Sequence, residues 1–231
     1  MTKNKPVCVS SVDHGGEFMM TPGLHKYACD LTLDPNTANI GLILSEENRK
    51  VTRVREEQSY PDHPERFDVL PQVLCGETLT GRCYWEAEWS GRDAEISVAY
   101  KGIKRKGRSD DCLFGRNEKS WSLNCSGHRL TVNHTKKFWS LDCSDRRFTV
   151  CHNKESTDIS SSPVSKRAGV FVDVSAGSLS FYSVSDTHTL THLHTFTHTF
   201  TDEPLCAGFT VYNSNSSVSL CHIKQHTHTT D

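Results

Sequence analysis

No stretch of apolar residues in this chain of 231 residues approaches the roughly 20 that a membrane-spanning helix needs. The first six residues are polar and lack the apolar segment of a secretory signal. The formal net charge of −2 gives no general attraction to nucleic acid or to a membrane surface. These absences predict a cytoplasmic protein whose partners include neither a membrane nor nucleic acid.

Cysteine pairs with the C-x-x-C spacing are also absent, which argues against a zinc site or a redox motif. Ten cysteines are nevertheless present: Cys8, Cys29, Cys75, Cys83, Cys112, Cys125, Cys143, Cys151, Cys206 and Cys221. Several occupy apolar positions of predicted strands, so we expect buried free thiols in a reducing cytosol. The glycosylation sequons that begin at Asn124, Asn133 and Asn215 are then expected to be unused.

Sustained apolar stripes of helical period are missing, whereas alternation of period two is frequent and predicts an all-β fold. The strongest example runs from Gly81 to Trp89. Its odd-numbered residues are Cys83, Trp85, Ala87 and Trp89, which predicts a central strand with a buried face. The even-numbered residues are expected to be exposed to solvent. Residues 96–100 are expected to pair with this strand, 66–70 to begin another strand, and 169–182 to form a hairpin.

An internal repeat stands out between Trp121 and His152. Residues 121–134 and 139–152 are identical at 9 of 14 aligned positions, with an offset of 18. A closed sheet has one position for such a strand, because each backbone donor in the sheet already has a hydrogen-bond partner. We therefore expect the two outer arms in the sheet and residues 127–144 protruding, either as a binding tip or as a neutral insertion.

Ordered motifs along the chain resemble those of the PRY-SPRY (B30.2) domain over residues 27–223. They are Leu33–Ala38, Leu44–Glu46 and Arg66–Asp68 in the first part, and Gly81–Glu86, Trp121–Leu123, Ala168–Asp173, Ala176–Tyr182 and Pro204–Leu205 in the second. The resemblance implies a bent antiparallel β-sandwich, concanavalin-like in topology. It divides the chain into a flexible leader (1–24), a PRY segment (25–75), a SPRY segment (76–223) and a polar tail (224–231).

Family members occur in tripartite-motif ubiquitin ligases, butyrophilins and NOD-like receptors, so the resemblance implies a non-catalytic module that binds a protein in innate immunity. One alternative is a sensor of a small phosphorylated ligand, as in butyrophilins. Another is a substrate-recruiting module for a ubiquitin ligase or immune receptor. Some relatives bind through aromatics just after the Trp-Ser-Leu motif; Asn124 and Ser126 stand there, so that chemistry does not carry over.

Binding is expected in the loops 53–64, 101–112, 125–152 and 196–204, since loops on a rigid scaffold carry most recognition residues. The candidate ligand-binding residues are Arg53, Arg55, Tyr60, Lys104, Arg105, Lys106, Arg108, Lys136, Phe138 and Trp139. A phosphorylated ligand would be held by basic residues of 49–55 and 101–108. As a solvated hairpin loop, residues 101–108 would need no function.

Catalytic signatures are absent from the sequence: we find no nucleophile elbow, metalloprotease helix or phosphate-binding glycine loop, and expect no enzyme activity and no cofactor. His188, His192, His194 and His198 share one parity and could line one face of a strand. Imidazoles with this spacing can hold zinc, but no carboxylate or cysteine pattern joins them. A surface strand with alternating threonine and histidine is the simpler interpretation, and no metal is expected.

Overall fold

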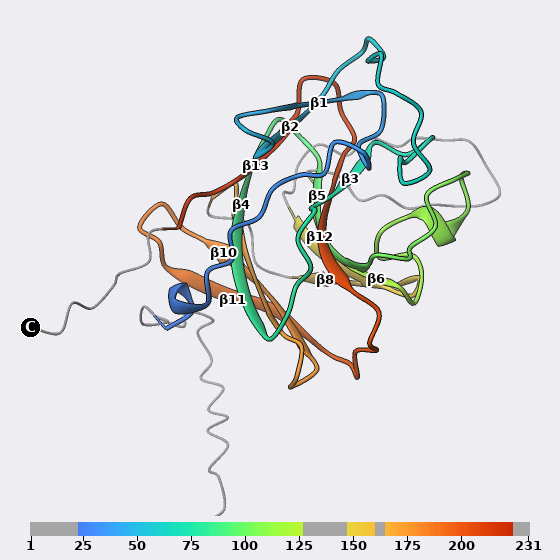
Figure 1. Ribbon diagram of the computed structural model, residues 1–231. Coiled ribbons are helices and arrows are strands. Elements are labelled where there is room, and N and C mark those ends of the chain that lie inside the picture. Colours follow the sequence, from blue (N-terminus) through green and yellow to red (C-terminus); the bar gives the residue numbers. More distant parts are fainter. Residues whose placement is uncertain (1–22, 127–146, 160–164, 224–231) are drawn as a thin grey trace, which may run out of the picture.

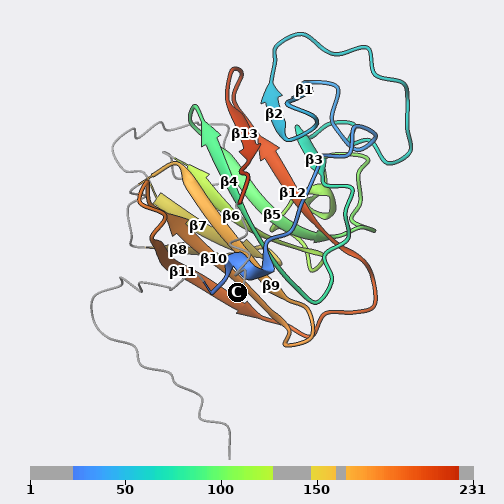
Figure 2. The same ribbon diagram turned by 60° about the vertical axis from the view of Figure 1, so that its left-hand side comes forward.

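Two antiparallel β-sheets pack face to face in the computed structural model, which describes residues 23–126, 147–159 and 165–223 (Figure 1). Figure 2 shows the strands of both layers in the same ribbon turned by 60°. The predicted all-β sandwich is confirmed. Helical structure in the described ranges is limited to two short 3-10 turns, η1 (His25–Tyr27) and η2 (Asp110–Cys112), and neither could span a bilayer.

One sheet has seven strands. In spatial order they are β1 (Leu42–Ser45), β2 (Lys50–Arg53), β13 (Ser217–Leu220), β4 (Arg82–Ser90), β9 (Arg167–Asp173), β10 (Ser178–Val184) and β11 (Leu190–Thr197). The strand predicted to be central, β4, lies in the middle of this order. Its neighbours are β13 and β9, which come from the last quarter of the chain and the segment before it.

The other sheet has six strands. In spatial order they are β3 (Gln72–Leu74), β12 (Leu205–Val211), β5 (Ala94–Tyr100), β6 (Ser120–Ser126), β7 (Arg147–His152) and β8 (Glu155–Ile159). The expected pairing of residues 96–100 with β4 is therefore wrong, because β5 crosses to this second sheet and pairs with β12 and β6. Residues 66–70 form no strand; Phe67 is buried under the loop that contains η2, and the strand starts only at Gln72.

The facing surfaces of the sheets form one apolar core. Trp85, Ala87 and Trp89 of β4 are buried in it together with Val98, Leu123, Phe181 and Phe209 from both sheets. The predicted buried face of β4 is thus confirmed. The expectation for the opposite face is wrong in part: Tyr84 and Glu86 are 0% and 3% exposed, because the N-terminal chain crosses over them. Glu88, beyond that crossing, is exposed as predicted.

The repeated arms lie next to each other in the six-stranded sheet. Trp121 of β6 is directly opposite His152 of β7, and the two strands stay in register to Ser126 and Arg147. The outer arms therefore occupy the sheet as predicted. The expected protruding tip, residues 127–144, and the leader and tail lie outside the described residues, as do Lys136, Phe138 and Trp139.

The cysteines depart from the prediction at one place. Cys29 and Cys83 form a disulfide with their Cα atoms 5.5 Å apart. The other cysteines of the described ranges are free, and all but Cys221 are buried: Cys75, Cys112, Cys125, Cys151 and Cys206. Parity along β4 correctly placed Cys83 on the inner side but could not show that a residue 54 positions earlier would reach it.

Candidate functional site

A row of polar residues crosses five strands on the outer face of the six-stranded sheet. The residues, each directly opposite the next, are Thr210 (β12), Glu95 (β5), Asn124 (β6), Thr149 (β7) and Asp158 (β8). Opposite residues of an antiparallel pair point to the same side of a sheet, so these side chains form one continuous polar row. We call it the polar row. It ends in a carboxylate on β8 and has a second carboxylate near its other end.

Glu95 is the most constrained member of the polar row, at 4% exposed. The hydroxyls of Thr210 and Tyr212 each donate to its Oε2 at 2.8 Å. Burial raises the pKa of this carboxyl, and the surrounding hydroxyls and Arg116 only partly offset the effect. The site therefore holds an acidic group whose negative charge is poorly stabilised by the protein itself.

Two acceptor oxygens near Glu95 are buried without a donor from the described part of the chain. They are Asn124 Oδ1 and Asp93 Oδ1. Asp93 does accept a 2.6 Å hydrogen bond from Asn213 through its other oxygen. At the outer end of the polar row, Thr149 donates to Asp158 at 3.0 Å. A buried acceptor without a donor is costly, so this face is suited to a ligand that brings donors.

The sequence analysis did not identify the polar row, although its signal was present. Glu95 and Ser97 alternate with Ile96 and Val98, and Ser122 and Asn124 alternate with Leu123 in the same way. Alternation along a single strand indicates only that one face is polar. Their alignment into one row depends on the register of five strands, which sequence alone does not give.

The basic loop at residues 101–108 is largely neutralised by its surroundings. Arg105 differs most from the expectation, because its side chain is only 7% exposed and forms an ion pair with Glu65 at 2.9 Å. Its guanidinium also donates to the carbonyls of Ile103 and Lys101, and lies over the ring of Phe67. Arg105 therefore holds the loop together and is not available to a ligand.

The remaining basic candidates are exposed but scattered. Lys104 pairs with Asp111 at 3.6 Å, Lys106 donates to the carbonyl of His63, and Arg108 is exposed. Arg55 is exposed at the end of β2, where Arg53 is half-buried. These side chains do not converge on one pocket in the described structure.

Tyr60 serves the fold rather than an open surface. Its hydroxyl donates to the carbonyl of Leu42 at 2.9 Å, and the Arg66 guanidinium lies 5.1 Å from its ring centre. The ring packs against the main core.

Histidines and aromatic rings gather at one open end of the sandwich. His152 stacks on Trp121 with ring centres 4.7 Å apart, and His198 and Phe200 contact the same indole. His152 Nδ1 lies 2.9 Å from the Ser120 carbonyl, and burial lowers the pKa of the imidazole. The lowered pKa favours the neutral form of the His152 imidazole, and its stacking on Trp121 makes it part of the packing.

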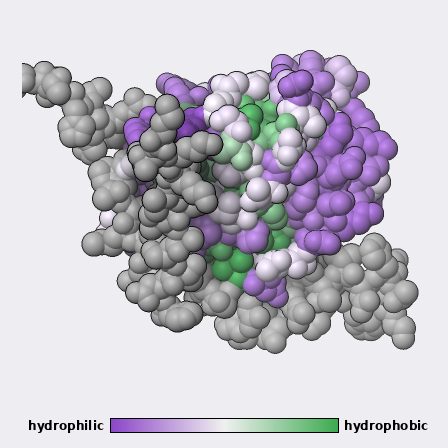
Figure 3. Space-filling model, turned by 90° about the horizontal axis from the view of Figure 1, so that it is seen from below, coloured by the Kyte–Doolittle hydropathy of each residue, from purple (hydrophilic) through white to green (hydrophobic). Residues whose placement is uncertain are grey.

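A pocket of about 300 Å³ adjoins this cluster. It is lined by residues 174–177, from the turn between β9 and β10, and by residues 197–200, after β11. Both segments lie at the lower end of the molecule in Figure 1, and Figure 3 views that end, where hydrophobic surface alternates with hydrophilic surface. None of its lining side chains is an acid or a lysine or arginine.

The possibility that the four histidines line one face does not hold. A β-bulge interrupts the pairing of β10 with β11, so that His192 is opposite Tyr182 while His194 is opposite Phe181. Consecutive residues of β10 point to opposite faces, and the two histidines therefore do too. His188 lies in the preceding turn. No group of three metal-ligating side chains occurs in the portion of the chain that the structure describes.

Two family models match this chain. One, described as the SPRY-associated domain (PRY), matches residues 31–79, and the other, the SPRY domain, matches residues 82–224. Together they cover both sheets and the polar row.

Known proteins similar to this chain fall into two groups. Stonustoxin subunit beta of Synanceia horrida is 40% identical over 199 residues, which cover 85% of this chain and 25% of that protein. Tripartite motif-containing protein 16 of Mus musculus is 34% identical over 197 residues, which cover 84% of this chain and 32% of that protein. The crystal structure of the TRIM65 PSpry domain matches with a TM-score of 0.68 at 26% identity. The match covers 87% of this chain and 94% of that domain. The chain thus spans a quarter to a third of the length of these curated relatives.

The cytoplasmic location predicted from the sequence is wrong. Similarity to toxin subunits points to an extracellular location, although the tripartite-motif relatives form a separate group. The Cys29–Cys83 disulfide agrees with this correction, because such bonds persist in oxidising compartments. The absence of an apolar segment in the first residues was the misleading signal.

Proposed function

Because the chain belongs to the PRY-SPRY family, we propose that it recognises a protein partner through the outer face of its six-stranded sheet, centred on the polar row. Domains of this family are generally non-catalytic interaction modules, and the proposal extends this to the present chain. The observation that carries it is the row itself: five aligned polar side chains, with the oxygen of Asn124 buried and without a donor from the described residues.

The chemistry of the polar row favours a partner segment rich in hydrogen-bond donors. Asp158, at the exposed end of the row, and the half-buried Asp93 supply carboxylates, and Asn124 supplies an amide oxygen. Backbone N–H groups and lysine or arginine side chains would satisfy these acceptors. A phosphorylated ligand would meet carboxylates here, and the basic loop pairs two of its own cations with acids, so a protein is favoured over such a ligand.

The biological setting belongs to the proposal as well. The relatives are several times longer than this chain, so we place this module within a larger recognition system, either toxin-like or of the tripartite-motif type. In the second setting it would select substrates for a ubiquitin ligase, and its immune role would follow from the partner. The two settings differ in the partner, not in the binding face.

Site-specific photo-crosslinking tests the proposed face. A photoreactive phenylalanine analogue replaces Asn124 in one protein, and Glu88, exposed on the outer face of the other sheet, in a matched control. Each is irradiated with secretions and tissue extracts from the source organism. We expect a discrete protein adduct at position 124 only.

Competition then identifies the groups that bind. Excess wild-type chain should suppress the adduct, whereas Asp158→Lys, altered at an exposed site, should suppress it at least tenfold less effectively. Equal adducts at positions 124 and 88, or equal competition by both proteins, would refute the proposed face.

A further inference from the structure

Residues 23–29 form a strap that crosses the outer face of β4 in the seven-stranded sheet (Figure 1). The strap contains η1, and its last residues run beside β4: Ala28 forms a parallel bridge with Tyr84, and Cys29 N donates to the Tyr84 carbonyl at 2.9 Å. The following residues, Leu31 and Leu33, enter the main core. The strap is therefore the first part of the described chain, and it leads directly into that core.

The strap covers a surface that would otherwise be apolar and exposed. Leu24 packs with Tyr84, Tyr182, Val184 and Leu190, all less than 9% exposed. These residues belong to a second cluster, separate from the core between the sheets. The strap thus occupies a docking surface made by β4, β10 and β11.

Polar contacts add to this cover. The ring of His25 stacks on Tyr84 at 5.6 Å, and its Nε2 lies 3.5 Å from Glu86 Oε1. Tyr84 also donates to Glu86 at 2.8 Å. The carboxylate of Glu86 is thereby shielded from water by the strap.

Non-covalent contacts hold the strap weakly. Leu24 is its one buried side chain, and Lys26 is exposed. Tyr27 is half-buried, accepts a hydrogen bond from Arg82 and packs beside Phe171. Ordering seven residues costs conformational entropy, which so few buried contacts offset only in part. The covalent bond to Cys83 keeps the strap near its surface.

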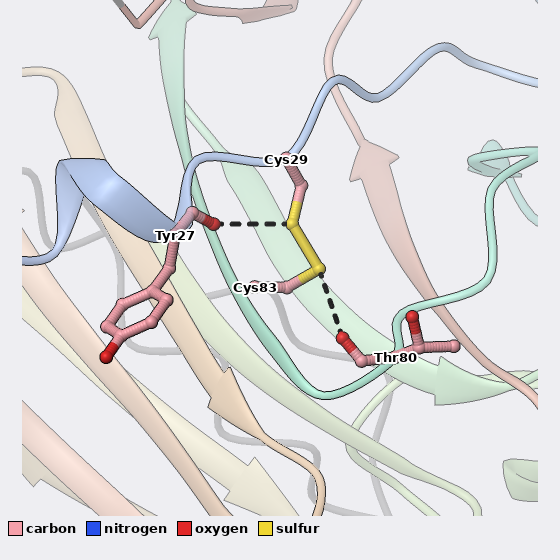
Figure 4. Close-up of a disulfide and its surroundings, with 4 residues drawn as sticks. All are labelled: Tyr27, Cys29, Thr80 and Cys83. Carbon is pink, nitrogen blue, oxygen red and sulfur yellow. Dashed lines mark hydrogen bonds between the residues drawn. A yellow bond between two sulfur atoms is a disulfide. The ribbon is translucent and has the colours of Figure 1, made fainter. Parts of the chain in front are cut away.

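Two backbone carbonyls flank the disulfide, one beside each sulfur (Figure 4). The Tyr27 carbonyl oxygen lies 3.5 Å from Cys29 Sγ, and that of Thr80 lies 3.9 Å from Cys83 Sγ. A disulfide sulfur carries no proton, so these contacts become S–H hydrogen bonds only after reduction. Each thiol of the reduced form thus finds an acceptor already in place.

We propose that the Cys29–Cys83 disulfide is a redox latch, which holds the strap on its docking surface in an oxidising compartment and releases it in a reducing one. Release of the strap exposes Tyr84, Tyr182 and Leu190 to solvent. The two sheets remain folded, because Cys29 is the one strap residue that packs against the core between the sheets, and no residue of the strap belongs to a strand.

The reductant is a thiol compound of the glutathione class. Its thiolate attacks the Sγ of Cys29, the less buried of the two residues, and the electron pair of the S–S bond leaves with Cys83, which takes a proton from water. A second thiol attacks the mixed disulfide. Cys29 is released as a thiol, and the two reductant molecules end as one disulfide.

Hydrogen exchange of the full chain with and without dithiothreitol tests the latch. We expect amides of residues 24–29 to exchange at least tenfold faster after reduction, while the β9–β10 hairpin changes less than twofold. Trypsin should cut after Lys26 at least tenfold faster as well. The Cys29→Ser variant should exchange rapidly under both conditions, which separates loss of the bond from other effects of the reductant.

Two results would overturn the proposal. Unchanged exchange of residues 24–29 would show that non-covalent contacts are enough to hold the strap. A similar increase in every strand would show that the disulfide supports the whole fold rather than latching one segment.

Discussion

Glu95 and Asn124 lie directly opposite each other on β5 and β6, so a carboxyl whose pKa is raised by burial faces an amide whose oxygen has no donor among the described residues. Both groups are acceptors on the same face of the sheet. This arrangement lowers the stability of the isolated domain, because the Glu95 carboxyl is desolvated and the Asn124 oxygen accepts no hydrogen bond from the described residues. A partner that brings a donor to this point relieves the cost, which links the local electrostatics to the proposed recognition.

Glu95→Gln should change how stability depends on pH. The pKa of Glu95 is raised in the folded state, so ionising it disfavours folding: stability is full below the unfolded pKa of about 4.3 and falls as pH rises through the folded value. Glutamine removes this loss and can donate to Asn124. We expect a gain of about 1 kcal/mol at neutral pH, the scale of one hydrogen bond. Urea unfolding from pH 3 to 8 measures it; parallel curves for both proteins would contradict it.

Asp173→Asn should weaken the domain at neutral pH but not in acid. Asp173 accepts hydrogen bonds from Ala176 N, Arg82 Nε and Ser175 Oγ, which lower its pKa to about 2. The stabilisation is present above the unfolded pKa of about 3.9 and is lost as pH falls towards 2. We expect a deficit of about 1.5–3 kcal/mol at pH 7, the range for bonds to charged groups. Melting curves at pH 7 and pH 2 check it, and an equal deficit at both would count against it.

Arg105→Ala and Lys104→Ala form a matched pair within the basic loop. Arg105 is buried and bonded to two carbonyls and Glu65, so its loss should cost about 2–3 kcal/mol by leaving buried acceptors unpaired. Lys104 is exposed and should stay within about 0.5 kcal/mol of wild type. Denaturant midpoints distinguish them. Equal effects would mean that Arg105 does not hold the loop.

Glycosylation should distinguish the two sequons that the structure describes. Asn215 is exposed in the turn between β12 and β13, whereas Asn124 lies within β6 with its amide oxygen buried in the polar row. Passage through a secretory pathway should therefore add a glycan at Asn215 and leave Asn124 unmodified. Peptide mass spectrometry after enzymatic deglycosylation gives the occupancy. A glycan at Asn124 would contradict the placement of that side chain, and Asn215→Gln serves as the control for the mobility shift.

Much of the fold could be predicted because strand alternation is a local property. The inward residues of β4, the hairpin of β9 and β10, and the pairing of the repeat's outer arms all follow from the order of apolar and polar residues. Recognition of the family followed from motifs that are themselves local. The sequence failed where a residue's role depends on a distant segment, as for Arg105, whose charge suggested a ligand site and whose burial depends on Phe67 and Glu65.

By itself, the sequence determined that this chain is an all-β sandwich with one apolar core, since alternation and tryptophan content require a surface to be buried. The tertiary structure alone decided which strands are neighbours, and therefore that Glu95, Asn124 and Asp158 fall in one row. It also decided that Cys29 reaches Cys83 and that a strap covers Tyr84. The physical reason is that strand register and the crossing of remote segments are set by the packing of the whole domain, whereas periodicity is set by each strand alone.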